Sequence, residues 1–489
     1  MVRERSGRSS LPAALLLFGF STPGFMLFGH FRGDGMRYVQ RLNLFMLAGV
    51  FAVGAVLLAP LTASAWEREP LSVYQQRRLR LVRETGGDGL IALFGYREED
   101  VAASVTTFRQ NEEFYYLTGW NEPEAMMLLV PTAPRHGEKP GIAKEILFIP
   151  PHNSAQERWT GSRLGSDDPQ APAETGFQMV ESTARFHSQL LDALKTFSTI
   201  YTELTPEAES GEDCFQKDVV ADLHKMAPLA KLADLRPLVT RMRMVKTPTE
   251  IALLRKAIDA SIDAHFAAFK AVRPGVWEYQ IAALMKYEFE RRGCEWPAYP
   301  PIVGSGFYST VLHYDADSRQ MQDGDVVVMD VGGAYSGYTA DITRTLPVNG
   351  RFTPRQREIY DIVLGAQNAV LAAARPGASL ARQGEDSLYQ IAYHYLNTHG
   401  KDLHGQPLGQ YFIHGLGHSI GLNVHDPFDF NQPLEPGMVV TVEPGLYIPE
   451  EKIGIRIEDD ILITKEGYEL LTRRLPRTAS EIEKLMSQK

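Results

Sequence analysis

The chain has 489 residues, of which 44% are hydrophobic and 22% charged, and its formal net charge is −10. This apolar content excludes a disordered or collagen-like chain, and two cysteines are too few for a disulfide scaffold. The acidic balance gives no electrostatic reason to bind nucleic acid or anionic lipid. The length suffices for two or three domains with substantial cores.

An apolar segment, Leu42–Leu61, follows basic residues near the N-terminus and ends in the small residues of TASAW at 62–66. This order is typical of a secretory signal peptide, so we expect cleavage near Ala65 and an exported protein, periplasmic or secreted. The alternative is an uncleaved membrane anchor, since about 20 apolar residues can span a bilayer. Met36 would begin a compact signal peptide by itself, which leaves open whether translation starts at Met1 or Met36.

Residues 66–240 alternate short apolar runs with amphipathic stretches, which is typical of an α/β domain. Four runs are predicted strands and one stretch is a predicted helix: Gly89–Gly95, Ala125–Pro131, Ile146–Pro150 and Thr199–Glu203 as strands, and Cys214–Met226 as the helix.

Residues 241–489 contain two helix pairs with the same boundary signals. Capping boxes with proline at the first helical position begin at Thr247 and Thr353, and Arg-Pro-Gly follows at 273–275 and 375–377. Each stop precedes another helical segment, 277–292 and 387–398. The repetition indicates an internal duplication, with coincidence of common capping residues as the alternative.

Predicted strands lie between and after these helices, at Asp325–Gly332, Val439–Glu443 and Ile453–Ile463. The second domain is therefore predicted to be α+β, with a sheet and two helix pairs, preceded by the smaller α/β domain.

Asp330 and Asp341 are eleven residues apart on either side of a predicted turn. If the hairpin is centred between Tyr335 and Ser336, the two aspartates are directly opposite, with Cβ atoms about 5 Å apart. Like charges this close are destabilising unless a cation lies between them, and a divalent metal ion is the usual solution. Two surface aspartates beside a turn are the alternative, which the apolar run before Asp330 disfavours.

Glu443 and Glu458 also lie in apolar strand patterns. Alternation along the strand places Arg456 and Glu458 on one face, opposite a row of isoleucines. We interpret Asp459 and Asp460 as the solvated end of this strand.

A histidine-rich segment, His414-Gly415-Leu416-Gly417-His418, is followed by His425. The glycines disfavour a helix, and no glutamate follows the first histidine, so this is not a zincin motif. Each histidine alone is more often structural than a ligand, but beside the carboxylates one of the three is expected to be a fifth ligand.

Four carboxylates and one imidazole, without a thiolate, favour harder divalent ions such as Mn²⁺ over structural zinc. Four negative charges suit two ions better than one. Two ions roughly 3.5–4 Å apart could hold a bridging hydroxide and fix a substrate carbonyl, so the sequence predicts metal-assisted hydrolysis.

Five segments together resemble the creatinase/aminopeptidase family with the pita-bread fold, and most closely aminopeptidase P, the Xaa-Pro aminopeptidases. Four lie in the second domain and one in the first: MDVGGAYSGYTADITRTLPVNGRFTPRQREIYDIVL, IHGLGHSIGLNVHD, LEPGMVVTVEPGLYI, KIGIRIEDDILIT and FRQNEEFYYLTGWNEPEA. The resemblance covers about residues 70–485. It implies the pita-bread pseudosymmetry, peptide substrates that begin Xaa-Pro, and a homo-oligomer.

The resemblance also implies a role for each matching residue. It makes five residues the ligands of two divalent ions, predicted to be Mn²⁺: Asp330, Asp341, His418, Glu443 and Glu458. Asp341 and Glu458 would bridge the ions, Glu443 would move the proton of the bridging water, and His425 would stabilise the substrate carbonyl or the tetrahedral intermediate. Residues expected to line or orient the substrate site are His313, His414, Arg456 and Tyr447.

The chain departs from several relatives in having short connections after His425 and between Glu443 and Glu458, which leaves open the pocket size, the longest peptide admitted and the subunit contacts. A prolidase, which cleaves only Xaa-Pro dipeptides, is the nearest alternative. The large first domain disfavours a methionine aminopeptidase. The five filled ligand positions disfavour a peptide-binding module without catalysis and a metal-free creatinase-like hydrolase.

Overall fold

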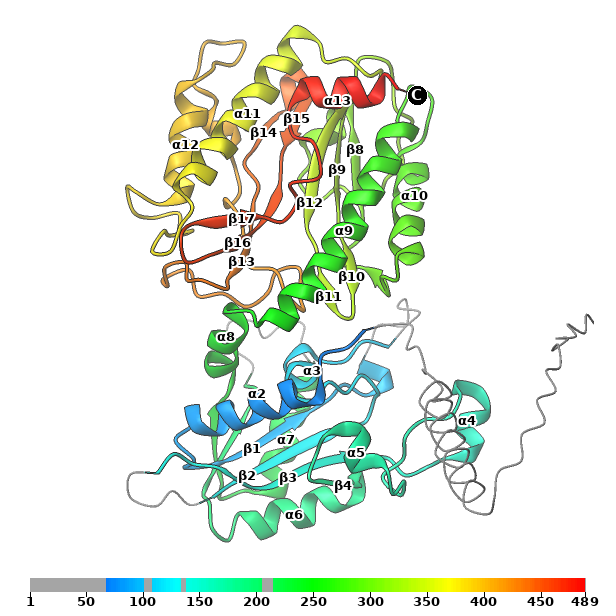
Figure 1. Ribbon diagram of the computed structural model, residues 1–489, viewed down its shortest axis with the longest axis vertical. Coiled ribbons are helices and arrows are strands. Elements are labelled where there is room, and N and C mark those ends of the chain that lie inside the picture. Colours follow the sequence, from blue (N-terminus) through cyan, green and yellow to red (C-terminus); the bar gives the residue numbers. More distant parts are fainter. Residues whose placement is uncertain (1–66, 101–107, 133–137, 205–213, 489) are drawn as a thin grey trace, which may run out of the picture. The chain divides into compact units, whose positions relative to one another are not determined.

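The computed structural model describes residues 67–100, 108–132, 138–204 and 214–488, which belong to one compact unit, Ala65–Lys489 (Figure 1). The predicted export segment and its cleavage site lie outside the described residues. Within these ranges, no helix has the length and apolar character needed to cross a membrane.

The N-terminal part is built on a mixed sheet, which has six strands in the described residues, in the order β4-β3-β2-β1-β5-β6. The strands β1, β2 and β3 pair antiparallel, whereas β4, β5 and β6 each pair parallel with a neighbour. Their bounds are β1 Leu90–Phe94, β2 Met126–Pro131, β3 Ile142–Ile149, β4 Met179–Ser182, β5 Thr199–Thr202 and β6 Lys231–Asp234. The four predicted strands are confirmed, while the short, half-polar strands β4 and β6 at the two edges were not predicted.

Alternate side chains of this sheet enter separate cores on its two faces. Ile91 and Leu93 pack on one face with α2, α3 and α8, whereas Leu90 and Ala92 pack on the other with α6 and α7. The helices of this part are α2 Leu71–Glu84, α3 Glu112–Thr118, α4 Ser154–Thr160, α5 Ala171–Thr175, α6 Phe186–Ala193, α7 Cys214–Met226 and α8 Arg236–Met244. The predicted helix at Cys214–Met226 is confirmed. Helix α8 crosses the predicted domain boundary between residues 240 and 241. The position of this boundary stays a prediction.

The two predicted helix pairs are present in the C-terminal part, where α9 packs on α10 and α11 on α12 (Figure 1). Thr247 and Thr353 form the predicted capping boxes with Glu250 and Gln356, and both helices end before their Arg-Pro-Gly segments. The bounds are α9 Pro248–Ala271, α10 Glu278–Arg291, α11 Pro354–Ala373 and α12 Leu388–Thr398, with α13 Ala479–Met486 near the C-terminus. Side chains from all of these helices join one core with the strands.

The strands of the C-terminal part form two similar groups. Strand β9 pairs with β12 and encloses the hairpin β10–β11, while β13 pairs with β16 and encloses the hairpin β14–β15. The architecture is thus α+β with two related halves, as predicted. The bounds are β7 Trp296–Pro297, β8 Ile302–Ser305, β9 Val326–Val331, β10 Gly333–Tyr335, β11 Tyr338–Thr339, β12 Ile342–Pro347, β13 Val439–Val442, β14 Gly445–Ile448, β15 Ile453–Arg456, β16 Asp459–Ile463 and β17 Tyr468–Leu470.

The predicted register of the first hairpin is wrong. Asp330 pairs with Thr343 rather than with Asp341. The turn is centred on Ser336 and Gly337, whose φ angles of 52° and 82° are those of a two-residue type I′ turn. This turn type matches the twist of the flanking strands and therefore decides the register.

The predicted strand Ile453–Ile463 is two strands that belong to different sheets. Glu458 lies in the break between β15 and β16. The prediction that Asp459 and Asp460 form a solvated end is also wrong, since both are fully buried. Asp459 accepts hydrogen bonds from Arg344 and Thr472, so its charge is compensated inside the protein.

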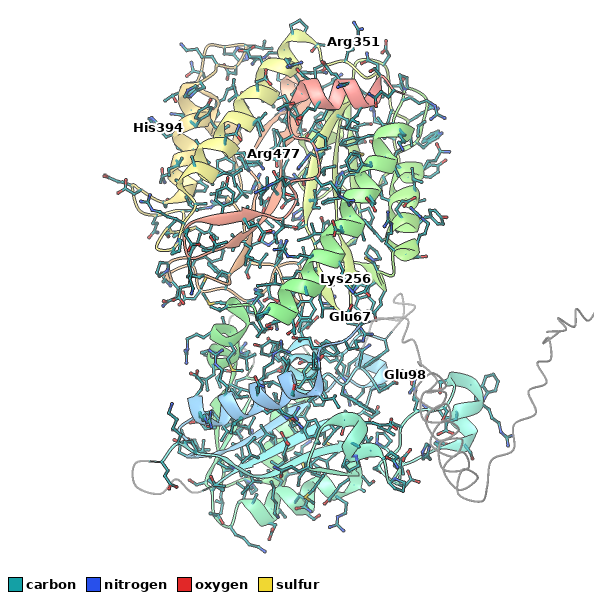
Figure 2. The ribbon with its side chains drawn as sticks, in the orientation of Figure 1. Glu67, Glu98, Lys256, Arg351, His394 and Arg477 are labelled. Carbon is teal, nitrogen blue, oxygen red and sulfur yellow. The ribbon has the colours of Figure 1, made fainter. Side chains whose placement is uncertain are left out.

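Glu67, at the start of the described chain, forms an ion pair with Lys256 of α9, and the two residues lie close together in Figure 2. Glu69 likewise accepts a hydrogen bond from the hydroxyl of Thr249 at 2.6 Å. The first described residues are therefore tied to the beginning of α9.

Candidate metal centre

A cavity of about 410 Å³ lies in the C-terminal part of the protein, among residues from the ends of several of its strands. It is lined by nine of the ten predicted site residues: His313, Asp330, Asp341, His414, His418, His425, Glu443, Arg456 and Glu458. Among the described residues, Tyr447 is the predicted site residue that does not line the cavity. Segments separated by more than a hundred residues in the sequence are thus brought together at one site.

Asp330 and Asp341 share a hydrogen-bond donor although they are not opposite in the hairpin. The hydroxyl of Tyr299 lies 2.6 Å from Oδ1 of Asp330 and 2.5 Å from Oδ1 of Asp341. Asp330 is the penultimate residue of the apolar strand β9, whereas Asp341 lies in the gap between β11 and β12. The irregularity of the chain at Asp341 therefore turns its carboxylate towards Asp330.

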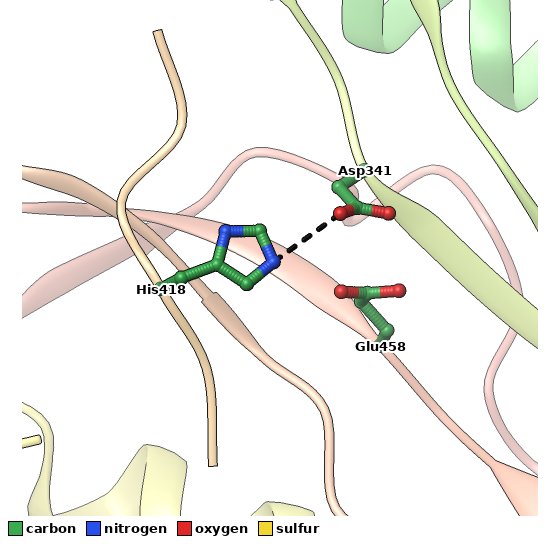
Figure 3. Close-up of side chains that lie close together, drawn as sticks. All are labelled: Asp341, His418 and Glu458. Carbon is green, nitrogen blue, oxygen red and sulfur yellow. Dashed lines mark ion pairs between the residues drawn. The ribbon is translucent and has the colours of Figure 1, made fainter. Parts of the chain in front are cut away.

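The imidazole of His418 lies between carboxylates from both halves. Its Nε2 is 3.3 Å from Oδ2 of Asp341 and 3.4 Å from Oε1 of Glu443. Asp341, His418 and Glu458 each offer a ligand atom, and these three atoms lie within 4.8 Å of one another (Figure 3). Glu458 is anchored by the hydroxyl of Thr343, which donates to its Oε2 at 2.6 Å.

Three of the four carboxylates are destabilised as anions. Burial raises the pKa of Glu443 to about 7, an effect that Asp341 increases and His418 opposes. Burial and the neighbouring carboxylates also raise the pKa of Glu458 well above its usual range. The pKa of Asp341 is also raised, mainly by burial and then by the neighbouring Asp330. The protein alone therefore does not fully compensate the negative charge of this cluster.

Asp330 is different because it has a cation of its own. Nη2 of Arg456 lies 2.5 Å from Oδ2 of Asp330. Burial alone would raise the pKa of Asp330, but Arg456 and the hydroxyl of Tyr299 outweigh it and hold the pKa below its usual range.

The donor set fits a divalent metal ion. Oxygen and nitrogen ligands bind such ions at about 2.0–2.2 Å, which places neighbouring ligand atoms about 3 Å apart. The separations of His418 Nε2 from the carboxylates of Asp341 and Glu443, 3.3 and 3.4 Å, agree with this geometry. A cation here would also relieve the repulsion that raises the pKa values of the three carboxylates.

A hydrogen-bonded chain orients His414 at the cavity wall. Nη1 of Arg456 donates to the hydroxyl oxygen of Tyr447 at 2.8 Å, and that hydroxyl lies 2.8 Å from Nε2 of His414. Because arginine only donates, the tyrosine proton goes to Nε2, and Nδ1–H of His414 donates to the carbonyl of Gly415 at 2.8 Å. Burial and then Arg456 lower the pKa of His414 to about 3, which agrees with this neutral tautomer.

His425 and His313 line the cavity and remain exposed to solvent. The ring of His425 lies 4.3 Å from that of His418, centroid to centroid, in an edge-to-face arrangement. The pKa of His425 is lowered to about 4, mainly by partial burial and further by the nearby imidazoles of His418 and His313. Its imidazole is therefore neutral near pH 7 and can donate a hydrogen bond to a ligand.

Sequence reasoning missed three hydroxyl groups that hold the carboxylates: those of Tyr299, Thr343 and Thr441. Thr441 accepts a hydrogen bond from the backbone N–H of His418 at 3.0 Å and donates to Glu443 at 3.2 Å. Thr343 could have been found, because it is the residue opposite Asp330 once the type I′ turn is recognised. Tyr299 lies in an irregular loop and gives no signal in the sequence.

Comparisons with known proteins agree with this geometry. Residues 252–465 match the model of metallopeptidase family M24, and residues 74–201 match that of the aminopeptidase P N-terminal domain. The chain is 38% identical to the Xaa-Pro aminopeptidase of Escherichia coli K12, over 84% of this chain and 97% of the relative. It is 34% identical to that of Haemophilus influenzae, over 86% and 98%.

Solved structures show the same similarity. Proline aminopeptidase P II from Yersinia pestis superposes with a TM-score of 0.74 at 36% identity and covers 86% of this chain and all of its own. An E. coli aminopeptidase P variant in complex with substrate has a TM-score of 0.74 at 35% identity, over 86% of this chain and 99% of that structure. The chain belongs to the aminopeptidase P family of M24 metallopeptidases and is a metallo-exopeptidase.

Proposed function

We propose that this protein hydrolyses the N-terminal Xaa-Pro bond of peptides in a metal-dependent reaction and releases the first residue. The observation that carries the proposal is the convergence of Asp341, His418 and Glu458, whose ligand atoms lie within 4.8 Å of one another in the wall of a cavity. The relatives named Xaa-Pro aminopeptidase that cover most of the chain support the choice of substrate.

Five residues are proposed to hold two ions: Asp330, Asp341, His418, Glu443 and Glu458. The oxygen-rich donor set favours Mn²⁺ over softer ions. When bound, the two ions would activate a water molecule and polarise the scissile carbonyl.

The remaining polar groups act on the substrate and the proton. Glu443 lies beside His418 at the cavity wall, where its carboxylate can accept the proton of the attacking water. The neutral imidazole of His425 can donate a hydrogen bond to the scissile carbonyl as negative charge develops on its oxygen.

The cavity wall suits a proline ring. An Xaa-Pro bond has no N–H, so its recognition depends on accepting the ring rather than on a hydrogen bond from the peptide nitrogen. Pro300, Ile302, Leu312 and Val424 supply an apolar lining beside His313 and His414.

Substrate length distinguishes the proposal from its nearest alternative. Metal-loaded protein is incubated with an Xaa-Pro dipeptide and with a pentapeptide that begins Xaa-Pro, and the first residue released is identified by mass spectrometry. We expect cleavage of the pentapeptide after its first residue. Cleavage of the dipeptide alone would identify a prolidase, and the same pentapeptide with alanine at the second position is the negative control.

The location of the protein is a second part of the proposal. The charged, apolar and small-residue segments of residues 36–65 support export with cleavage near Ala65. N-terminal sequencing of the exported protein should find Trp66 first, whereas retention of the segment would identify a membrane anchor. A homo-oligomer stays a prediction, which the mass of the protein in solution tests.

A further inference from the structure

His418 and His425 come from one loop that folds back on itself. The backbone N–H of Asp426 donates to the carbonyl of Ser419 at 2.9 Å, and these two residues form an isolated antiparallel bridge. Side chains of successive residues point to opposite faces of such a bridge. The two imidazoles therefore share the face towards the cavity, and the side chains of Ser419 and Asp426 share the other.

Two buried cations bind this second face. Nζ of Lys246 donates to Oγ of Ser419 at 2.8 Å and to Oδ2 of Asp426 at 3.2 Å. Nη2 of Arg243 donates to Oδ1 of Asp426 and to Oδ1 of Asn423, both at 2.6 Å. Lys246, Arg243 and Asp426 are each at most 5% exposed. Lys246 thus contacts the residue after each histidine, so its position sets the separation of the two rings.

The cations come from the segment that joins the N-terminal sheet part to α9. Arg243 lies in the last turn of α8, and its Nη1 is 2.9 Å from Oε1 of Glu113 in α3. The preceding residue, Met242, is buried in the core that covers one face of the N-terminal sheet. The clamp formed by Lys246 and Arg243 is therefore held by the packing of the N-terminal part.

Stability alone does not account for these charges. Taking two cations and a carboxylate out of water is costly, and apolar residues of similar volume often stabilise a fold as well or better. Ion pairs and hydrogen bonds instead restrict the Ser419–Asp426 bridge to one geometry.

We propose that Lys246 and Arg243 are positioning residues, which hold His418 and His425 at the separation needed for metal binding and for substrate contact. The inference rests on the proposed function for the roles of the two histidines. It makes the geometry of the metal centre depend on the N-terminal part of the chain, which itself contributes no residue to the cavity lining among the described residues.

The test is Lys246→Met, which removes the charge and both hydrogen bonds. We expect binding of Mn²⁺ to the folded, chelator-treated protein to weaken about tenfold, and kcat on an Xaa-Pro pentapeptide to fall 10- to 100-fold, as for other groups that orient metal ligands. KM should change much less than kcat. Metal binding is measured by calorimetric titration well below the unfolding temperature, so that a loss of stability alone does not change it.

Arg78→Met is the matched control. Arg78 is fully buried and lies 2.5 Å from Glu145 in the N-terminal part, so its replacement also breaks a buried ion pair. It should lower the unfolding temperature while metal affinity and kcat stay within twofold of the original protein. Equal losses in Arg78→Met and Lys246→Met would overturn the proposal, as would metal affinity and kcat within twofold in Lys246→Met.

Ser419→Ala gives an answer even if Lys246→Met does not fold, because it removes one hydrogen bond, that from the ammonium group of Lys246 to the serine hydroxyl, and leaves the ion pairs intact. Metal affinity should fall three- to tenfold, and an unchanged affinity would overturn the proposal. The titration needs no substrate. A protein that binds Mn²⁺ but cleaves no Xaa-Pro peptide would refute the proposed function, while the variants would still decide the role of the clamp.

Discussion

The two halves of the C-terminal part place their carboxylates by the same backbone plan. In each half an apolar strand is followed by a hairpin, a break in the chain and a strand that pairs back with the first. Asp330 in β9 corresponds to Glu443 directly after β13, and Asp341 in the first break corresponds to Glu458 in the second. The related geometry explains how four carboxylates from separate segments meet at one point.

The halves differ in how they compensate this charge. Asp330 is paired with Arg456, which belongs to the other half, whereas Glu443 faces the imidazole of His418. The pKa of Asp330 is accordingly held low, while burial raises that of Glu443 to about 7. The two halves thus share their backbone plan but differ in charge compensation. Arg456 compensates the carboxylate of Asp330 in the first half, whereas the carboxylates of the second half depend more on a metal ion.

The largest expected effect comes from the two residues in the breaks. Glu458→Gln and Asp341→Asn keep the shape of each side chain but remove a charge that is proposed to contact both ions. We expect kcat/KM on an Xaa-Pro pentapeptide to fall by about 10³-fold or more in each, since a metal ion supplies several kcal/mol of charge stabilisation. If one variant keeps a tenth of the original activity at saturating Mn²⁺, its half does not supply a bridging ligand.

Arg344→Met breaks a contact between the halves. Arg344 of β12 lies 2.7 Å from Asp459 of β16, and both side chains are fully buried. The variant removes the close cation of Asp459 and leaves it only Arg477, whose Nε is 3.7 Å away, so the free energy of unfolding should fall by about 3 kcal/mol in urea titrations. Arg344→Met combined with Asp459→Leu should recover part of this loss. A loss below about 1 kcal/mol in the single variant would show that the pair does not hold the halves together.

Removal of the metal should reverse the pH dependence of stability. The pKa of Glu443 is raised from 4.5 to about 7 in the folded protein, so the folded state holds a proton that the unfolded state releases. His418, with a pKa raised to about 9 by Asp341 and Glu443 against the effect of burial, acts in the same direction. Stability of the chelator-treated protein should therefore fall by about 4 kcal/mol as the pH rises from about 5 to 8.

The stability of the metal-loaded protein should instead rise between pH 5 and 8, because protons compete with the ion for its ligands at low pH. Thermal unfolding at four pH values, with and without chelator, checks both curves. A melting temperature of the metal-free protein that rises between pH 5 and 8 would contradict the proposed charge excess.

The smallest effect concerns the turns of the two hairpins. The first turn has glycine at one of its left-handed positions, Gly337, whereas the second has Lys452 at φ 54°. A side chain in this region is strained by about 1 kcal/mol. Lys452→Gly should therefore raise the free energy of unfolding by at most about 1 kcal/mol and leave activity unchanged, since Lys452 is exposed. A decrease would show that other contacts stabilise this turn.

Local signals predicted much of this fold correctly. The capping boxes at Thr247 and Thr353 mark the starts of α9 and α11, because a cap depends on residues three positions apart. The register of the β9–β12 hairpin was missed by two residues, because it depends on the conformation of Ser336 and Gly337 rather than on the pattern of the strands. The short edge strands β4 and β6 were missed because half of their residues are polar and none is fully buried.

The sequence by itself determined the two helix pairs and helix α7, the apolar strands and the residue types that can bind a metal, since these depend on propensity and periodicity over a few positions. Only the tertiary structure decided how the charges are paired. Arg456 and Asp330 are 126 residues apart, and Lys246 and Asp426 are 180 apart. Such contacts, and the burial of Asp459 and Asp460, depend on how distant segments pack, which no local pattern encodes.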